Sequence, residues 1–147
     1  MRRVSVFPLL LSLLLFPPLS AFSKEKAVRI AVFPGGTKIK MEVAETEPDR
    51  RLGLMFRDHL PVGTGMLFIF PTEAPHRFWM KDCKFPIDII WLNQRKQIVY
   101  IAESVPPCKD NSCPDYGPKG QLALYVIETS AGFSKKEGLR SGMTVRF

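Results

Sequence analysis

The 147-residue sequence has few of the residues that build metal centres, and it has no nucleotide-binding motif. It contains two His and three Cys, and these do not occur at the spacing of a zinc site. No glycine-rich phosphate-binding loop is present, and neither an internal repeat nor a low-complexity tract is found. We therefore expect a protein without a metal or another cofactor, and we expect it to be a monomer.

The charge of the sequence is basic but scattered. Lys and Arg number 21 against 14 Asp and Glu, which gives a net charge of +7 at pH 7. The adjacent basic residues Arg50–Arg51 and Lys135–Lys136 are only pairs, whereas nucleic-acid binding requires a basic stripe along one face. We expect no nucleic-acid partner and interpret the charge as an aid to solubility near an anionic cell envelope.

The N-terminal region predicts export. Two Arg precede an apolar run, Val4–Leu19, and Ala21–Ser23 places small residues where a signal peptidase reads. Pro residues interrupt the run, which is shorter than the ~20 apolar residues that span a bilayer; a retained membrane anchor is the alternative. We predict a Sec-type signal peptide at residues 1–23 and a single domain at residues 24–147. The protein is then periplasmic or secreted, with no membrane span after cleavage.

Cysteine usage agrees with export. Cys108 and Cys113 lie close together in a Pro-rich loop, and such a pair in an oxidising compartment predicts a local disulfide. A redox-active pair is the alternative, but the spacing is not the CxxC that activates a thiol at a helix start. Cys83 is then a free thiol.

Most of the remaining sequence predicts short β-strands, because apolar residues alternate with polar ones or form short continuous runs. Residues Pro34–Thr37 form a turn signal that should join the first two strands into a hairpin. The predicted strands, about eight in number, are Val28–Phe33, Lys38–Ala44, Met66–Phe70, Arg77–Lys81, Ile87–Leu92, Gln97–Glu103, Leu122–Thr129 and Thr144–Phe147.

Two short helices interrupt the predicted strands. Thr46 can cap a helix that begins with Glu47–Asp49, where Pro is tolerated in the first turn. Residues Ser134–Glu137 form a capping-box pattern for the second helix. The apolar residues that should share one face of the first helix are Leu52, Met55 and Phe56. Many short strands with two brief helices predict a mainly β fold, a single compact β-sandwich or partly open barrel.

Several short motifs occur together in this chain. They are Glu42–Thr46, Arg50–Arg57, Gly65–Phe68, Phe78–Lys81, Pro86–Asp88, the Pro- and Cys-bearing loop, Val126–Glu128 and Ala131–Gly132. Together they resemble DUF192, a family of small bacterial and archaeal proteins that are often exported. The resemblance covers nearly all of the mature chain. It implies a single mainly β domain and brings no established activity, substrate or cofactor.

The chain departs from the DUF192 pattern at two places. Asp82-Cys83 stands where the family commonly has Asn-Thr, and Gly142-Met143 stands where Gly-Asp is usual. The first departure argues against Cys83 as a nucleophile shared by the family.

Two catalytic arrangements can be drawn from the reactive side chains. Cys83 and His76 could act as nucleophile and base, but the sequence supplies no orienting third group, and a free Cys is more often a small buried hydrophobe. Asp88 paired with Asp82 or with Glu128 could perform acid–base chemistry. Isolated acidic residues are more often solvated or ion-paired, so a carboxylate-dependent hydrolase is an alternative and not the leading interpretation.

Soft metal ligands offer a third interpretation. Met55, Met66 and Met80, with His76 and Cys83, are of the type that holds Cu(I) in exported proteins. Met66 lies within an apolar run, however, and Met55 lies on an apolar helix face, where Met normally fills gaps in a core. A copper carrier is therefore an alternative, and no metal ligands are assigned.

The segment around Trp79 carries the leading hypothesis. Arg77, Trp79 and Lys81 fall on one face of a predicted strand, whereas Phe78 and Met80 fall on the other. An indole between two cations is unusual for a core and suits stacking with charge-assisted hydrogen bonds to an anion. The DUF192 resemblance implies that further residues shape the rim of this site: Arg51, Met55, Arg57 and Asp88.

The sequence thus predicts an exported, non-enzymatic binding module for a small anionic ligand, a glycan or an envelope partner. The alternatives are the hydrolase and the copper carrier. The competing interpretation of Trp79 is that its ring covers one end of the core and the neighbouring charges merely solvate it.

Overall fold

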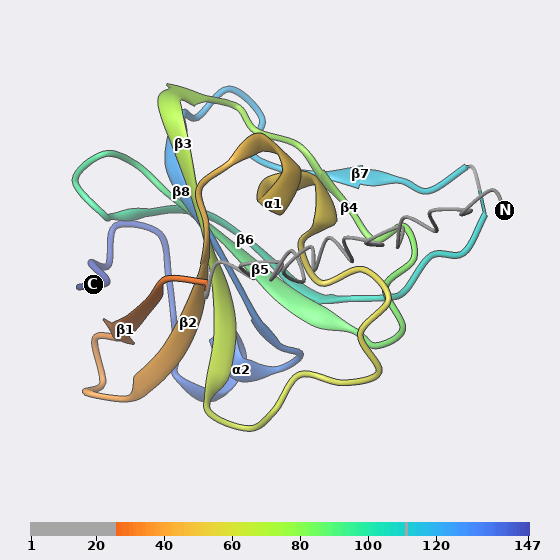
Figure 1. Ribbon diagram of the computed structural model, residues 1–147. Coiled ribbons are helices and arrows are strands. Elements are labelled where there is room, and N and C mark those ends of the chain that lie inside the picture. The colour runs from red at the N-terminus through yellow and green to blue at the C-terminus, as the bar shows by residue number, and fades with distance from the viewer. Residues whose placement is uncertain (1–25, 111) are drawn as a thin grey trace, which may run out of the picture.

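The computed structural model describes residues 26–110 and 112–147 as a curved β-sheet that is not closed into a barrel (Figure 1). The predicted signal peptide, residues 1–23, lies outside the described residues. The mainly β class is confirmed, with eight strands and two short helices in the described part of the chain. Within that part, no helix is both long and apolar enough to cross a membrane.

Six strands form the main sheet, in the order β1-β2-β3-β8-β5-β6. Only β2 and β3 pair in parallel, and the other neighbours are antiparallel. The bounds are β1 Val28–Val32, β2 Lys38–Ala44, β3 Thr64–Ala74, β5 Ile87–Leu92, β6 Ile98–Val105 and β8 Ala123–Ser130. A separate two-stranded ribbon pairs β4, Phe78–Trp79, with β7, Asp115–Tyr116.

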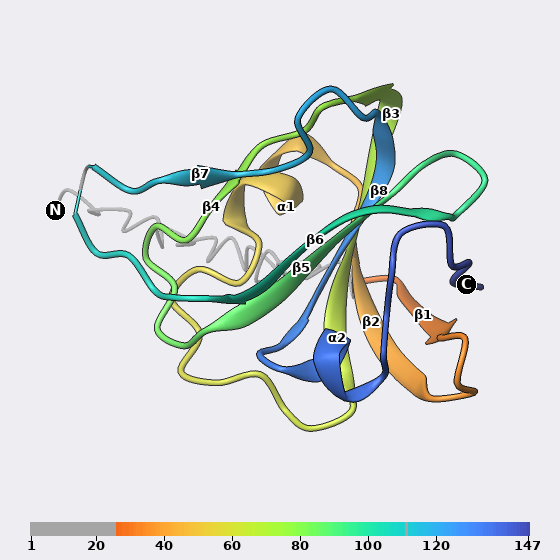
Figure 2. The same ribbon diagram turned by 180° about the vertical axis from the view of Figure 1, so that it is seen from behind.

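The sheet has an apolar cluster on each face, because successive side chains of a strand point to opposite sides. Ile89 and Trp91 on β5 belong to one cluster, and Ile90 and Leu92 belong to the other. Partly buried residues of the β4–β7 ribbon, such as Phe78, pack against the first cluster. We call the face that this cluster occupies the ribbon face. Figure 2 shows the same arrangement from behind, with the ribbon projecting away from the sheet.

The predicted hairpin and most predicted strands are confirmed, but the prediction needs three corrections. The segment expected as a strand at Arg77–Lys81 has only two strand residues, because its single partner, β7, is equally short. The expected last strand, Thr144–Phe147, is not a strand and makes isolated bridges from Thr144 and Arg146. The sequence prediction did not include β7.

The first helix, α1 (Glu47–Leu52), begins as predicted. The Thr46 side chain accepts a hydrogen bond from the Asp49 N–H at 3.3 Å, and a Pro stands in the first turn. The helix ends at Gly53, whose φ of 47° lies in the left-handed region. Met55 and Phe56 therefore lie beyond the helix, and the prediction that they share a helical face with Leu52 is wrong.

The second helix, α2 (Phe133–Lys136), is capped from outside its own segment. Ser134 lies within the helix, and its N-cap Gly132 makes no side-chain capping bond, so the predicted capping box is wrong. The acceptor comes instead from Asp88 on β5, which is fully buried. Its carboxylate accepts from the N–H groups of Ser134 at 2.7 Å, Gly132 at 3.0 Å and Ser104 at 2.8 Å. Asp88 thus ties α2 and β6 to the centre of the sheet.

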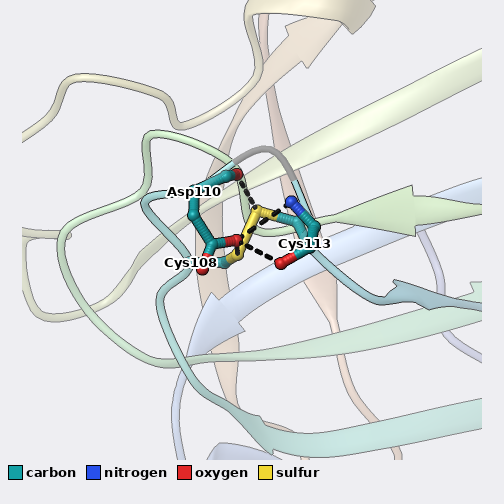
Figure 3. The surroundings of a disulfide bond; sticks show 4 residues. Cys108, Asp110 and Cys113 are labelled. Carbon is teal, nitrogen blue, oxygen red and sulfur yellow. Dashed lines mark hydrogen bonds between the residues drawn. A yellow bond between two sulfur atoms is a disulfide. The ribbon is translucent and has the colours of Figure 1, made fainter.

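The disulfide prediction is confirmed. Cys108 and Cys113 are bridged, with 5.7 Å between their Cα atoms, and Asp110 lies beside the bridge (Figure 3). Cys83 is free and buried. The Cys108 backbone also pairs with the exit of β4, because its N–H donates to the Met80 carbonyl and its carbonyl accepts from Asp82, each at 3.1 Å. The bridged loop therefore holds the segment that follows Trp79.

Candidate functional site

The two residues of β4 have opposite surroundings. Phe78 packs edge-on against Phe68 at 4.9 Å and against Trp91 at 5.8 Å between ring centroids, which anchors the ribbon on the sheet. Trp79 points the other way, is 49% exposed and belongs to neither apolar cluster. Buried aromatic packing under Phe78 therefore holds an exposed indole in a fixed place.

A groove runs between this indole and α1. Its outer part has a volume of about 250 Å³ and its deeper part about 40 Å³. We call the two parts together the Trp79 groove. Its walls and floor include Arg50, Arg51, Leu52, Met55, Phe78, Trp79, Phe68, Cys83 and Glu128. Leu52, at 44% exposure, faces solvent beside the indole. The groove therefore offers an apolar, aromatic surface with cations at its rim.

Two of the cationic side chains beside the groove are hydrogen-bonded to other parts of the protein. The Arg77 guanidinium donates to both the carboxylate and the carbonyl of Asp115, at 2.7 and 2.9 Å, and to the Gly117 carbonyl at 3.0 Å. Asp115 thereby raises the pKa of Arg77. Arg50 donates to the carbonyls of Glu45 and Ile69 and lies over the Phe70 ring. These two side chains fix the ribbon and α1.

The two other cationic side chains beside the groove, Arg51 and Lys81, differ from each other in exposure. The Arg51 side chain is 78% exposed and makes an ion pair with Glu47 at 3.2 Å within the helix, an arrangement of small energetic weight. Lys81 is half-buried, and its Nζ lies 5.4 Å from the centroid of the Trp79 ring. Arg51 is therefore the cation at the rim that an incoming anion reaches most readily.

A buried carboxyl group lies at the floor of the groove. Glu128 on β8 is 5% exposed, and its Oε2 has no hydrogen-bond partner among the described residues. Burial raises the pKa of Glu128 to about 8, and the charge of Arg57 opposes this rise only in part. Glu128 is therefore mostly protonated at neutral pH.

Cys83, which also lines the floor, is not poised as a nucleophile. Burial, with the nearby carboxylates of Glu128 and Asp82, raises the pKa of its thiol to about 12, whereas reactive thiols have lowered pKa values. His76 stacks on Phe70 with 3.5 Å between centroids, and its Nε2 lies 3.1 Å from the Thr72 carbonyl. These contacts do not form the nucleophile–base pair that catalysis would require.

The structure brings together most of the side chains that the sequence singled out around Trp79. Arg51 and Met55 line the groove with the indole, Arg77 lines its outer part and Lys81 contacts the ring. Arg57 is half-buried and holds Glu42 through two bonds, at 2.6 and 2.7 Å. This pairing raises the pKa of Arg57 and lowers that of Glu42.

Asp88 is not brought to the groove. It pairs across the sheet with Thr129, whereas Glu128 pairs with Ile89. Neighbouring strand residues point to opposite faces, so the carboxyl groups of Asp88 and Glu128 lie on opposite sides of the sheet. This geometry disfavours the pair as the acid and base of a hydrolase.

The family of the chain follows from comparison with known proteins. The profile of DUF192, described as "Uncharacterized ACR", matches residues 30–147. The chain belongs to the DUF192 family. No curated protein sequence matches it.

Two solved structures resemble this DUF192 protein along most of their length. One is a protein of Sinorhizobium meliloti 1021, described provisionally as a transcription regulator, with 26% identity and a TM-score of 0.72; the match covers 82% of this chain and 94% of that one. The other is a protein of unknown function from Novosphingobium aromaticivorans DSM 12444, with 24% identity and a TM-score of 0.73. That match covers 89% and 90% of the two chains. The second likeness establishes the shared fold.

Two of the soft metal ligands named in the sequence are core residues of this DUF192 domain. Met66 and Met80 are each 1% exposed and pack in the core of the ribbon face. The one cluster with metal-ligand spacing among the described residues combines Asp110 with Cys108 and Cys113, whose sulfurs are joined in the disulfide. Bridged sulfurs are not the thiolates that bind metals.

A larger cavity in the described part of the DUF192 domain lies elsewhere. It measures about 380 Å³ and is lined by residues at the start of β3 and around α2, among them Thr64, Thr129 and Phe133. None of the site residues predicted from the sequence lines it. Size alone does not make a binding site, and we base the functional argument on the smaller Trp79 groove because it combines an exposed aromatic ring, a rim cation and a buried unpaired carboxyl group.

Glu128 is the member of the groove that the sequence analysis undervalued, since it considered this residue only as a partner of Asp88. The available signal was a carboxyl group two residues after Val126 in an apolar strand, which places both side chains on one face. The sequence does not reveal that β8 lies between β3 and β5. That central position is what buries the carboxyl group.

Proposed function

We propose that this DUF192 protein is exported to the cell envelope and acts there as a non-enzymatic binding module for a small anionic ligand, with the Trp79 groove as its site. The observation that carries the proposal is the half-exposed indole beside α1, on a ribbon that Phe78 anchors to the sheet. A large aromatic ring normally contributes to a core, so an exposed ring that faces a groove is typical of ligand stacking. The local disulfide supports export, because such bonds persist in oxidising compartments.

The charge distribution supports an anionic ligand. Arg51 is exposed and only weakly paired at the rim, and Lys81 lies against the indole. A carboxylate or a phosphate group near them would gain charge-assisted hydrogen bonds while the rest of the ligand stacks on the ring. The Arg77 guanidinium already donates to Asp115 and Gly117, so we assign it to stabilising the ribbon and not to contacting the ligand.

The charges do not favour a nucleic-acid surface, which needs a stripe of available cations. Arg57 is held by Glu42 and Arg77 is held by Asp115, so the cations beside α1 and the ribbon do not form such a stripe.

Native mass spectrometry of protein isolated from a periplasmic extract tests the proposal. N-terminal sequencing of the preparation should read Lys24 first, as signal cleavage predicts. We expect the spectrum to show an organic anion bound to the wild-type protein and missing from a Trp79→Ala variant that still unfolds cooperatively on heating.

Other results of this measurement would count against the proposal. One equivalent of copper in place of an organic anion would favour a metal carrier. Bare protein in both preparations, or the same adduct on both, would refute a ligand at Trp79.

A further inference from the structure

We propose that Glu128 selects the ligand by donating a hydrogen bond to a carboxylate that enters the deep part of the Trp79 groove. The inference rests on the proposed function and specifies the ligand as a small carboxylic acid with a flat apolar body. The body stacks on Trp79, the carboxylate reaches the floor, and Arg51 stands at the rim.

The position of Glu128 carries the inference. It is a central-strand residue whose neighbours in register are Met66 on β3 and Ile89 on β5, so its side chain rises between apolar side chains on the ribbon face. Its Oε2 has no hydrogen-bond partner among the described residues, although buried polar groups are normally paired. A group at the floor of a groove with an unused hydrogen bond is suited to a ligand atom.

The deep part has room for a carboxylate group. Its volume is about 40 Å³, and one water needs roughly 10–15 Å³ of such space. The outer part, at about 250 Å³, leaves room for a ring against Trp79.

The charged and titratable groups around Glu128 determine how its protonation state changes with pH. The strands on either side contribute only apolar side chains at the paired positions. The remaining elements contribute Arg50 and Arg51 from α1, Arg57 with its partner Glu42, and Cys83 with Asp82 from the loop after β4. Arg57 is already held by Glu42, and the Cys83 thiol stays neutral over the working range because its pKa is about 12.

The direction of the pH effect follows from this setting. Burial raises the pKa of Glu128 to about 8, so the side chain is a neutral donor below that pH and an anion above it. An anionic Glu128 cannot donate to a carboxylate and repels it. Affinity for a carboxylate should therefore be highest below pH 8 and should fall above it, while a cationic ligand would show the opposite trend.

Nuclear magnetic resonance titrations with sodium benzoate at pH 6.5 and pH 9 test the inference on the mature wild-type protein and on Glu128→Gln. At one pH unit above its pKa only about a tenth of the carboxyl groups remain protonated. We expect the wild-type affinity for benzoate to fall about tenfold between the two pH values. The variant keeps an N–H donor at both pH values, so its affinity should change less than about twofold.

The outcomes separate this inference from the proposed function. Benzoate binding at Trp79 that is independent of pH in the wild type, or that falls equally with pH in Glu128→Gln, would overturn the role of Glu128 and leave the groove as a site. Wild-type protein that does not bind benzoate at Trp79 at either pH would overturn both. The wild-type comparison stands even if Glu128→Gln does not fold.

Discussion

At the scale of single residues, the two tryptophans differ in burial and therefore in their expected roles. Trp91 is completely buried, and its Nε1 donates to the His76 carbonyl at 2.8 Å. Trp79 is half-exposed on the ribbon, one residue after the aromatic anchor Phe78. The alternation Arg77-Phe78-Trp79 in the sequence predicted that the Phe78 and Trp79 side chains point to opposite faces, because successive side chains of a strand alternate.

The two tryptophans should differ in their effect on stability. Trp91→Ala removes a buried ring and a hydrogen bond, and we expect it to lower the free energy of unfolding by about 4–5 kcal/mol. Trp79→Ala removes only partial burial, and we expect a loss of about 1–2 kcal/mol. Urea denaturation of the two variants measures the difference. Equal losses would mean that Trp79 covers the core, as the competing interpretation holds.

At the scale of elements, the main feature is that helix α2 is capped by a side chain from strand β5. Ser134–Glu137 matches a capping box in sequence, but Asp88 on β5 provides the acceptor for this turn. The pattern misleads because the choice between a local and a distant acceptor depends on the sheet order. Sequence reasoning could not have placed β5 next to β8 and beneath α2.

Asp88 should therefore matter for stability and not for binding. Asp88→Ala leaves the buried N–H group of Ser134 and the part-buried N–H groups of Gly132 and Ser104 without their acceptor, and an unsatisfied buried group costs about 1–3 kcal/mol. We expect a loss of about 1–3 kcal/mol, a smaller loss for Asp88→Asn, and unchanged benzoate affinity in whichever variant folds. Urea denaturation measures the stability. Asp58→Ala, which removes an exposed ion pair with Lys84, is the control and should leave stability nearly unchanged. An unaltered stability of Asp88→Ala would contradict this account of α2.

At the scale of the whole molecule, the sequence predicted the fold class better than the site. Strand periodicity predicted the mainly β architecture, and the Cys spacing predicted the disulfide. The site required knowledge of topology, because α1, β4 and β8 are distant in sequence and meet only when β2 and β3 pair in parallel and β8 inserts beside β3. Trp79 could be chosen from strand alternation and Arg51 from the family resemblance, whereas the burial of Glu128 could not be predicted.

In the folded molecule, the exposed ring of Trp79 and the buried carboxyl group of Glu128 line the same groove. Aromatic packing behind Phe78, the Arg77–Asp115 pair and the disulfide loop fix the ribbon before any ligand arrives. A preformed site of this kind loses little conformational entropy on binding. On the proposed function, the Trp79 groove is therefore a preformed site for a small anion.

The most direct test is a nuclear magnetic resonance titration of the mature wild-type protein with benzoate at pH 6.5, with neutral benzamide as the matched probe. We expect the Trp79 indole N–H signal to shift with saturation for benzoate and much less for benzamide, while the buried Trp91 indole signal stays in place. A Trp79 signal that does not move, or shifts that occur instead around the cavity beside α2, would contradict anion binding in the Trp79 groove.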